Sequence, residues 1–157
     1  MTTSLFSEPL LLAVGANHRL ASTEQVTFSD LKEENFILLG EASSLAAHVR
    51  RLSGDFDFEP SITHRCAQLS TVKSLTAMGL GVSILPRSAR TANDPAGLVY
   101  RKFSDVTPMR EIALISHYRH HLSRGAQSFV DAARAVVGPI QSETTTPPFR
   151  PSAKAKT

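Results

Sequence analysis

Cysteine, aromatic residues and long apolar runs are scarce in this 157-residue sequence, which has one cysteine, no tryptophan and 6% aromatic residues. The single cysteine, Cys66, excludes an intrachain disulfide and a thiolate metal cluster. The longest apolar run, residues 9–14, is far shorter than the roughly 20 residues that a membrane-spanning helix needs. No basic residue precedes the first apolar stretch, so a secretory signal is not indicated. We therefore expect a cytoplasmic protein that makes no contact with a membrane.

An excess of charge of one sign is also lacking over most of the chain, although the net charge is +3 and the pI is near 9.4. Residues 138–157 contain three basic residues and one acidic residue, which leaves 14 basic against 13 acidic residues in residues 1–137. A surface that binds duplex DNA concentrates basic residues on one face. We therefore predict no direct DNA contact by this chain.

Apolar residues make up 41% of the sequence, and their spacing changes repeatedly between that of a strand and that of a helix. Such alternation is typical of an α/β fold. Residues 138–157 are rich in Pro, Ser and Thr and are predicted to be disordered, because they offer few apolar groups to bury. The spacing predicts strands over residues 10–14, 36–39, 60–66, 81–86, 98–103 and 111–116, and helices that begin at Ser43-Ser44, at Ser70 or Thr71, and at about residue 122.

Residues 70–86 form the most specific pattern in the sequence, a capped helix that ends in Gly-Leu-Gly and is followed at once by a short apolar strand and a proline. Gly79 can adopt the positive φ that ends a helix, and we expect Gly81 to let the backbone turn tightly into the strand. Pro86 cannot donate a backbone hydrogen bond and therefore ends the pairing. This segment closely resembles the effector-binding domain of LysR-type transcriptional regulators.

Two further segments support the resemblance in the same order along the chain. Residues 8–21 resemble the strand that leads from the first subdomain to the second, and residues 30–39 resemble the opening of that second subdomain. The resemblance implies an α/β fold of the periplasmic-binding-protein-like type II, with one complete subdomain and part of the other. It assigns residues 1–19 to the strand and crossover of subdomain I, 20–92 to subdomain II, 93–137 to the return strands and closing helix of subdomain I, and 138–157 to the tail.

Other parts of the family's regulators have no counterpart in this sequence. These are the N-terminal winged helix-turn-helix, the long linker helix and the opening of the first subdomain. We therefore expect a truncated regulator that retains a ligand-sensing role. The resemblance also implies that the full-length protein forms a homo-oligomer.

The resemblance implies that a small-molecule effector, often an organic anion, binds between the two subdomains without any cofactor. Helix N-termini attract anions through their free amides and the helix dipole. The predicted contact residues lie on the crossing strand and at two helix N-termini, and they are Ala13, Val14, Ser43, Ser44, Gln68, Leu69, Ser70 and Thr71. The alternative interpretation is that the four hydroxyl side chains in this set only cap their helices.

Cys66 and three histidines suggest two other kinds of chemistry. Cys66 follows a histidine and an arginine, whose positive charge would lower the pKa of a thiol and suit a redox sensor. We favour a small buried group at a strand end, because a reversible sensor needs a second cysteine. The spacing of His117, His120 and His121 could hold a metal, but no carboxylate lies close in the sequence, so we predict no metal site.

Catalysis has little support in the sequence, which contains no G-x-S-x-G elbow, no Walker loop and no G-x-G-x-x-G motif. The acidic cluster of Asp55, Asp57 and Glu59 is interpreted as a solvated turn. We therefore predict a regulator and not an enzyme. The main alternative is a solute-binding protein of a transport system, which shares the two-lobed architecture but would carry an export signal.

Overall fold

The computed structural model describes residues 2–116 and 123–137, so the predicted disorder of residues 138–157 and the three clustered histidines lie outside the described residues. The chain divides into two compact units, Leu10–Pro108 and Met1–Pro9 with Met109–Thr157. The elements are, in chain order, β1 (Thr2–Gly15), η1 (Arg19–Ala21), η2 (Phe28–Leu31), β2 (Asn35–Leu39), α1 (Ser44–Asp55), β3 (Ser61–Cys66), α2 (Leu69–Ala77), β4 (Ser83–Pro86), η3 (Arg87–Ala89), β5 (Leu98–Arg101), β6 (Met109–Ile115) and α3 (Arg124–Val137).

The larger unit, Leu10–Pro108, is built on strands that follow one another in the order β3–β2–β4–β1–β5. β2 and β3 are parallel, whereas β1 is antiparallel to both β4 and β5. Backbone hydrogen bonds join the β2 and β4 regions, from Ile37 N to Val82 O at 2.9 Å and from Val82 N to Asn35 O at 2.8 Å. The apolar run of residues 10–14 is buried throughout, as predicted for a strand covered on both faces.

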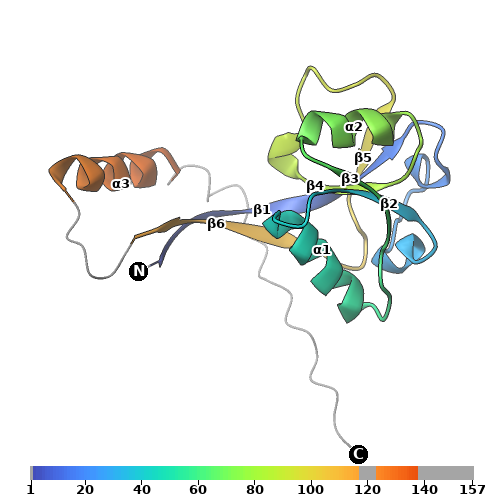
Figure 1. Ribbon diagram of the computed structural model, residues 1–157, viewed down its shortest axis with the longest axis horizontal. Helices are drawn as coiled ribbons and strands as arrows, with labels where there is room; N and C mark the ends of the chain where they lie inside the picture. Colours follow the sequence, from blue (N-terminus) through green and yellow to red (C-terminus); the bar gives the residue numbers. More distant parts are fainter. Residues whose placement is uncertain (1, 117–122, 138–157) are drawn as a thin grey trace, which may run out of the picture. The chain divides into compact units, whose positions relative to one another are not determined.

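Helices cover both faces of these strands. Figure 1 shows α2 above the strands and α1 below them. The chain runs from β2 through α1 to β3, and then from β3 through α2 back past β2 to β4. The two crossovers run in opposite directions along the strands' order, so right-handed connections place α1 and α2 on opposite faces. α1 buries Leu45, Val49 and Leu52, which are four and three positions apart on one face of the helix, together with Ala46.

Phenylalanine rings fill part of the core of the larger unit. The Phe28 side chain is fully buried, and its ring centroid lies 4.9 Å from that of Phe56, 5.1 Å from that of Phe103 and 5.8 Å from that of Phe58. Tilted aromatic pairs at these separations attract one another beyond the effect of burial. The rings therefore hold η2, the segment after α1 and the segment after β5 together.

The two glycines of the Gly-Leu-Gly motif have different roles. Gly79 has φ +80° directly after α2, which confirms the predicted helix end. Gly81 has no positive φ, so the requirement for glycine there does not come from its backbone conformation. A side chain at position 81 would instead place its Cβ 2.5 Å from the carbonyl oxygen of Asn35, so glycine is required for close approach to β2.

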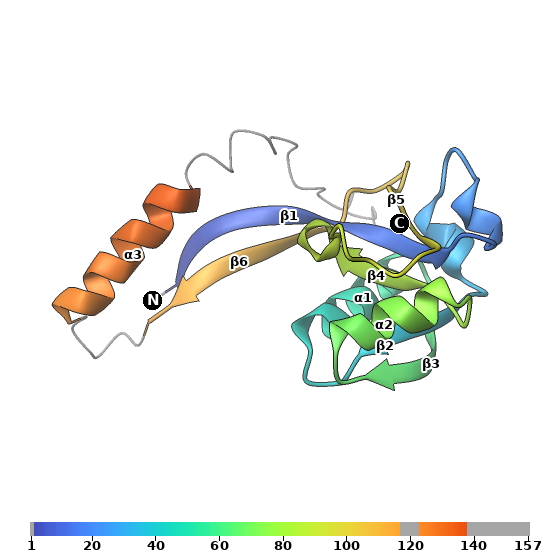
Figure 2. The same ribbon diagram turned by 90° about the horizontal axis from the view of Figure 1, so that it is seen from above.

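The smaller unit, Met1–Pro9 with Met109–Thr157, contains the first part of β1, together with β6 and α3. β1 and β6 form an antiparallel ribbon that pairs Thr2 with Ile115 and Pro9 with Met109 (Figure 2). Glu8 and Arg110 lie opposite each other in this ribbon and form an ion pair at 2.6 Å. None of the described helices is both long enough and apolar enough to cross a bilayer.

Candidate functional site

The N-termini of α1 and α2 lie at the same edge of the larger unit. Because β2 and β3 are parallel, their carboxyl ends meet at one edge, and each strand is followed directly by one of these helices. The loop after β2 is joined to the last residue of β3 by a hydrogen bond from the Gly40 N–H to the Cys66 carbonyl, at 3.0 Å. The structure therefore brings together two of the features that the sequence proposes for a ligand site.

Ser43 and Ser44 begin α1. Ser43 is the N-cap residue, and its hydroxyl oxygen accepts a hydrogen bond from the Leu45 N–H at 3.3 Å. The capping interpretation therefore describes the side chain of Ser43. Ser44 is the first helical residue, and its side chain is exposed.

α2 begins earlier than the capping rules predict. Its N-cap is Gln68, which forms no side-chain capping bond, and the helix starts at Leu69. The prediction that Ser70 or Thr71 caps the helix is therefore wrong, since both lie within the first turn with exposed side chains. The N–H groups of a first turn have no carbonyl partner within the helix. This turn therefore presents backbone donors next to exposed hydroxyl groups.

The structure does not bring Ala13 and Val14 next to these helix N-termini. Both side chains are completely buried within β1. At this edge β1 contributes Leu10, which pairs with Pro86, and Val14 lies about 14 Å further along the strand at roughly 3.4 Å per residue. The end of β1 packs instead against the C-terminal end of α2, where a Cβ on Gly15 would lie 3.1 Å from the Ala77 carbonyl oxygen.

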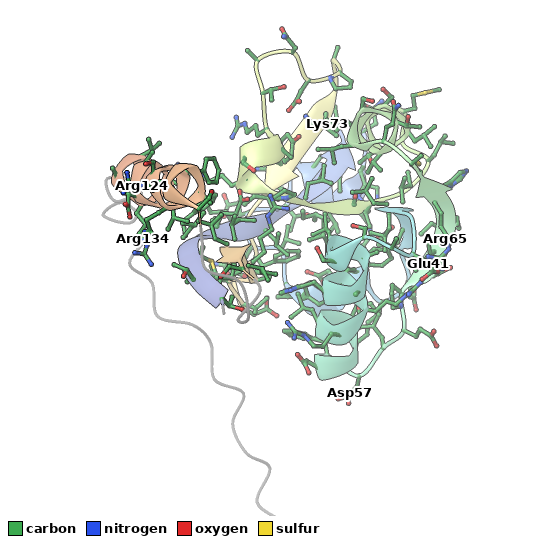
Figure 3. All side chains as sticks on the ribbon, turned by 60° about the vertical axis from the view of Figure 1, so that its left-hand side comes forward. Glu41, Asp57, Arg65, Lys73, Arg124 and Arg134 are labelled. Atoms are coloured by element: carbon green, nitrogen blue, oxygen red, sulfur yellow. The ribbon has the colours of Figure 1, made fainter. Side chains whose placement is uncertain are left out.

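A charged cluster also lies beside the loop that precedes α1. Glu41 accepts two hydrogen bonds from the Arg50 guanidinium, both at 2.7 Å, and its carboxylate lies 2.6 Å from Arg65 (Figure 3). The hydrogen bonds from Arg50 lower the pKa of Glu41. Two guanidinium groups share one carboxylate, so these three side chains together carry a net positive charge, which the nearby Glu59 carboxylate partly offsets. The sequence analysis missed it because its members come from a loop, a helix and a strand, without a local spacing that would indicate contact.

The remaining chemical candidates have structural roles in the described part of the chain. Cys66 is 7% exposed and belongs to the hydrophobic core at the end of β3. Asp57 has φ +58°, a left-handed conformation that aspartate tolerates, in the turn after α1. Among the described residues, no group of three or more His, Cys, Asp or Glu side chains could hold a metal ion.

Comparisons with known proteins identify the family. The family described as "LysR substrate binding domain" matches residues 2–138. The uncharacterized HTH-type transcriptional regulator YybE of Bacillus subtilis is 37% identical over 82 residues, which are 52% of this chain and 28% of that protein. The chain spans less than half the length of the curated relatives it matches.

Solved structures show the same fold. The C-terminal domain of a probable LysR family transcriptional regulator from Rhodococcus sp. RHA1 matches with a TM-score of 0.74 and 25% identity, over 85% of this chain and 66% of that one. The effector binding domain of QuiR, solved in complex with shikimate, matches with a TM-score of 0.79 over 88% of this chain and 66% of that one. At 21% identity this second likeness shows the fold alone.

These findings confirm the predicted periplasmic-binding-protein-like α/β fold. The named relatives are transcriptional regulators and not enzymes, which favours the regulator interpretation over a solute-binding protein of a transport system. The match covers most of the chain, and the chain belongs to the LysR substrate-binding domain family.

Proposed function

We propose that this chain is the ligand-sensing part of a LysR-type transcriptional regulator and that it binds a small organic anion at the N-termini of α1 and α2. The observation that carries the proposal is the position of both N-termini at one edge of parallel strands, joined through Gly40 and Cys66. Each helix N-terminus is equivalent to roughly half a positive charge. Two such ends at one edge favour an anion more than either end alone.

The contact residues in this proposal are Ser43, Ser44 and the segment from Gln68 to Thr71. The side chains of Ala13 and Val14 are not included, because they are buried away from this edge. The net positive charge of the cluster formed by Glu41, Arg50 and Arg65 adds to the attraction. We also propose that residues 20–92 form subdomain II and that residues 1–19 and 93–137 contribute to subdomain I.

The regulator that contains this chain would act in the cytoplasm as a homo-oligomer, and this chain would make no direct contact with operator DNA. The family assignment and the small net charge of residues 1–137 support these proposals. The effector would change the population of conformations by binding one of them more tightly. No cofactor is needed for such a role.

Ser70→Asp tests the site with Ser74→Asp as its matched control. Both serines are exposed on α2, but only Ser70 lies in the first turn. A carboxylate in the first turn stabilises a helix and repels an anion that binds there, so lost binding would not reflect a damaged helix. Binding is measured by calorimetry with acetate, succinate, benzoate, shikimate and 2-phosphoglycolate at constant ionic strength.

We expect at least one of these anions to bind the unchanged chain and to bind the Ser70→Asp variant at least tenfold more weakly. Ser74→Asp should change the affinity less than threefold, because position 74 is a full turn away from the free amides. Equal losses in both variants, or unchanged binding in Ser70→Asp, would contradict the proposed location. An absence of binding by every anion would contradict the ligand-sensing proposal for this chain.

A further inference from the structure

Lys73 carries a buried positive charge in the middle of α2. Its side chain is only 10% exposed, and its ammonium group donates hydrogen bonds to the Ala89 carbonyl oxygen and to the Asp94 carboxylate. The distance from Lys73 Nζ to Asp94 Oδ1 is 2.6 Å. A buried ammonium is tolerated only when it is paired and hydrogen-bonded. Lys73 therefore depends on both acceptors for its place on the inner face of the helix (Figure 3).

Both acceptors lie on the segment between β4 and β5. Ala89 ends η3, and Asp94 also accepts hydrogen bonds from the Thr91 backbone N–H at 3.2 Å and from the Thr91 hydroxyl at 2.9 Å. Burial alone would raise the pKa of Asp94, but the hydrogen bonds from Lys73 and Thr91 outweigh it and lower the pKa to about 2. Asp94 is therefore ionised at neutral pH, and the contact with Lys73 is a full ion pair.

The same pair connects this segment to the first turn of α2. Lys73 follows Leu69 by four positions, so it lies one turn after the start of the helix and on the same face as Leu69. Gln68 supplies no side-chain cap that would fix the first turn locally. Leu69 packs against the hydrophobic core, and the Lys73–Asp94 pair adds a directional polar contact one turn further along α2.

From these contacts we infer that Lys73 is a positioning residue for the anion site, which it orients by tying α2 to Ala89 and Asp94. The inference rests on the proposed function, because it concerns the same helix N-terminus. Lys73 does not touch the anion, since its ammonium is engaged by two acceptors on the inner side of the helix. Its effect on affinity passes through the position of the first-turn N–H groups.

The test compares Asp94→Asn with Glu34→Gln in the full chain. Both carboxylates are largely buried, with side-chain exposures of 13% and 16%, and both are paired with cations. Glu34 pairs with His18 and Arg19 directly before the start of β2, at the opposite end of that strand from the two helix N-termini. The control therefore removes a comparable ion pair and leaves the helix anchor in place.

Affinity is measured with the anion that binds the unchanged chain best among acetate, succinate, benzoate, shikimate and 2-phosphoglycolate. We expect Asp94→Asn to weaken binding by about 2- to 30-fold, the usual size of coupling between neighbouring parts of a protein. Glu34→Gln should leave affinity within twofold. Lys73→Met combined with Asp94→Asn should lose no more affinity than the larger single effect, because both changes break one pair.

A second measurement tests the positioning role of Lys73 in the absence of an anion. In the ligand-free chain, Asp94→Asn should speed hydrogen exchange of the Val72 and Lys73 amides, whereas Glu34→Gln should not. Unchanged exchange in α2, or equal loss of affinity in Asp94→Asn and Glu34→Gln, would overturn the positioning role. If no anion binds the unchanged chain, the proposed function fails, and the exchange result alone then shows whether Lys73 holds the first turn.

Discussion

Phe28 in the larger unit is enclosed by three other phenylalanine rings, whereas Phe129 in the smaller unit leaves 64% of its surface exposed. The same contrast extends to other residues, because Ile115 and Val136 of the smaller unit are also mostly exposed. A ribbon of two strands is marginally stable by itself in water. The larger unit is therefore expected to carry most of the stability of the chain.

The contrast matters for function because the candidate ligand site lies in the larger unit. Both helix N-termini, the cluster around Glu41 and the Lys73–Asp94 pair all belong to Leu10–Pro108. A site that recognises a small anion needs donors held in fixed positions. The packed core of this unit can supply that rigidity.

Replacing the most buried ring should produce the largest difference between the units. Phe28→Ala removes a completely buried side chain and should lower the free energy of unfolding by about 3 to 5 kcal/mol. Phe129→Ala removes an exposed ring and should change it by less than about 0.5 kcal/mol. Urea denaturation measures both values, and similar losses in the two variants would contradict the contrast.

Two glycine substitutions should act in opposite directions. Gly81→Ala would place a Cβ 2.5 Å from the Asn35 carbonyl oxygen and should destabilise the chain by about 1 to 3 kcal/mol. Gly125→Ala in α3 meets no atom within 4 Å and should be neutral or stabilise the helix by up to about 1 kcal/mol. Thermal unfolding measures the two effects. An unchanged stability of Gly81→Ala would contradict the close approach of the segment after α2 to β2.

The charged pair of Asp94 and Lys73 should make stability depend on acid pH. The pKa of Asp94 is lowered from its ordinary value of 3.8 to about 2 in the folded chain. Its contribution, up to about 2 kcal/mol, is therefore present above pH 4 and is lost as the pH falls from about 4 through about 2. Urea denaturation between pH 2 and 5 should show that the free energy of unfolding falls less with acid in Asp94→Asn than in the unchanged chain. An identical dependence of this free energy on pH in both would exclude the pair as a source of acid sensitivity.

The exposed cluster around Glu41 should contribute least. Glu41→Gln removes the carboxylate shared by Arg50 and Arg65, and solvent screens these charges, so the free energy of unfolding should change little. Because the change frees two guanidinium groups beside the candidate site, anion affinity should rise, with the greater effect at low salt. Calorimetry at two salt concentrations measures this, and weaker anion binding would contradict the electrostatic role.

Local signals in the sequence predicted much of the larger unit. The apolar run before Gly15 predicted the buried half of β1, and Ser43 predicted the start of α1, because burial and capping depend on neighbours in the sequence. The spacing of apolar residues did not predict the first half of β1, and only the resemblance to the family assigned residues 1–19 to a strand and crossover. Residues 2–9 are mixed in polarity and form a strand only by pairing with β6, about 100 positions away.

Only part of the candidate site could be predicted from the sequence, because some of its contacts join residues that are far apart in the chain. The start of α2 was placed too late, because Ser70 and Thr71 fit the capping rules better than Gln68 does. Lys73 and Asp94 are 21 positions apart and lie on different elements, so no spacing rule connects them. The sequence predicted glycine at position 81 as a residue that lets the backbone turn, whereas the atom that excludes a side chain there belongs to β2.

Native-state hydrogen exchange on the full chain tests most directly whether the larger unit is the self-sufficient part of the molecule. The amides of β2, β4 and the second half of β1 should exchange only through global unfolding, whereas those of β6 and α3 should exchange through smaller openings at lower free energy. Equal protection of β6, α3 and β2 would show one cooperative body and would contradict the account.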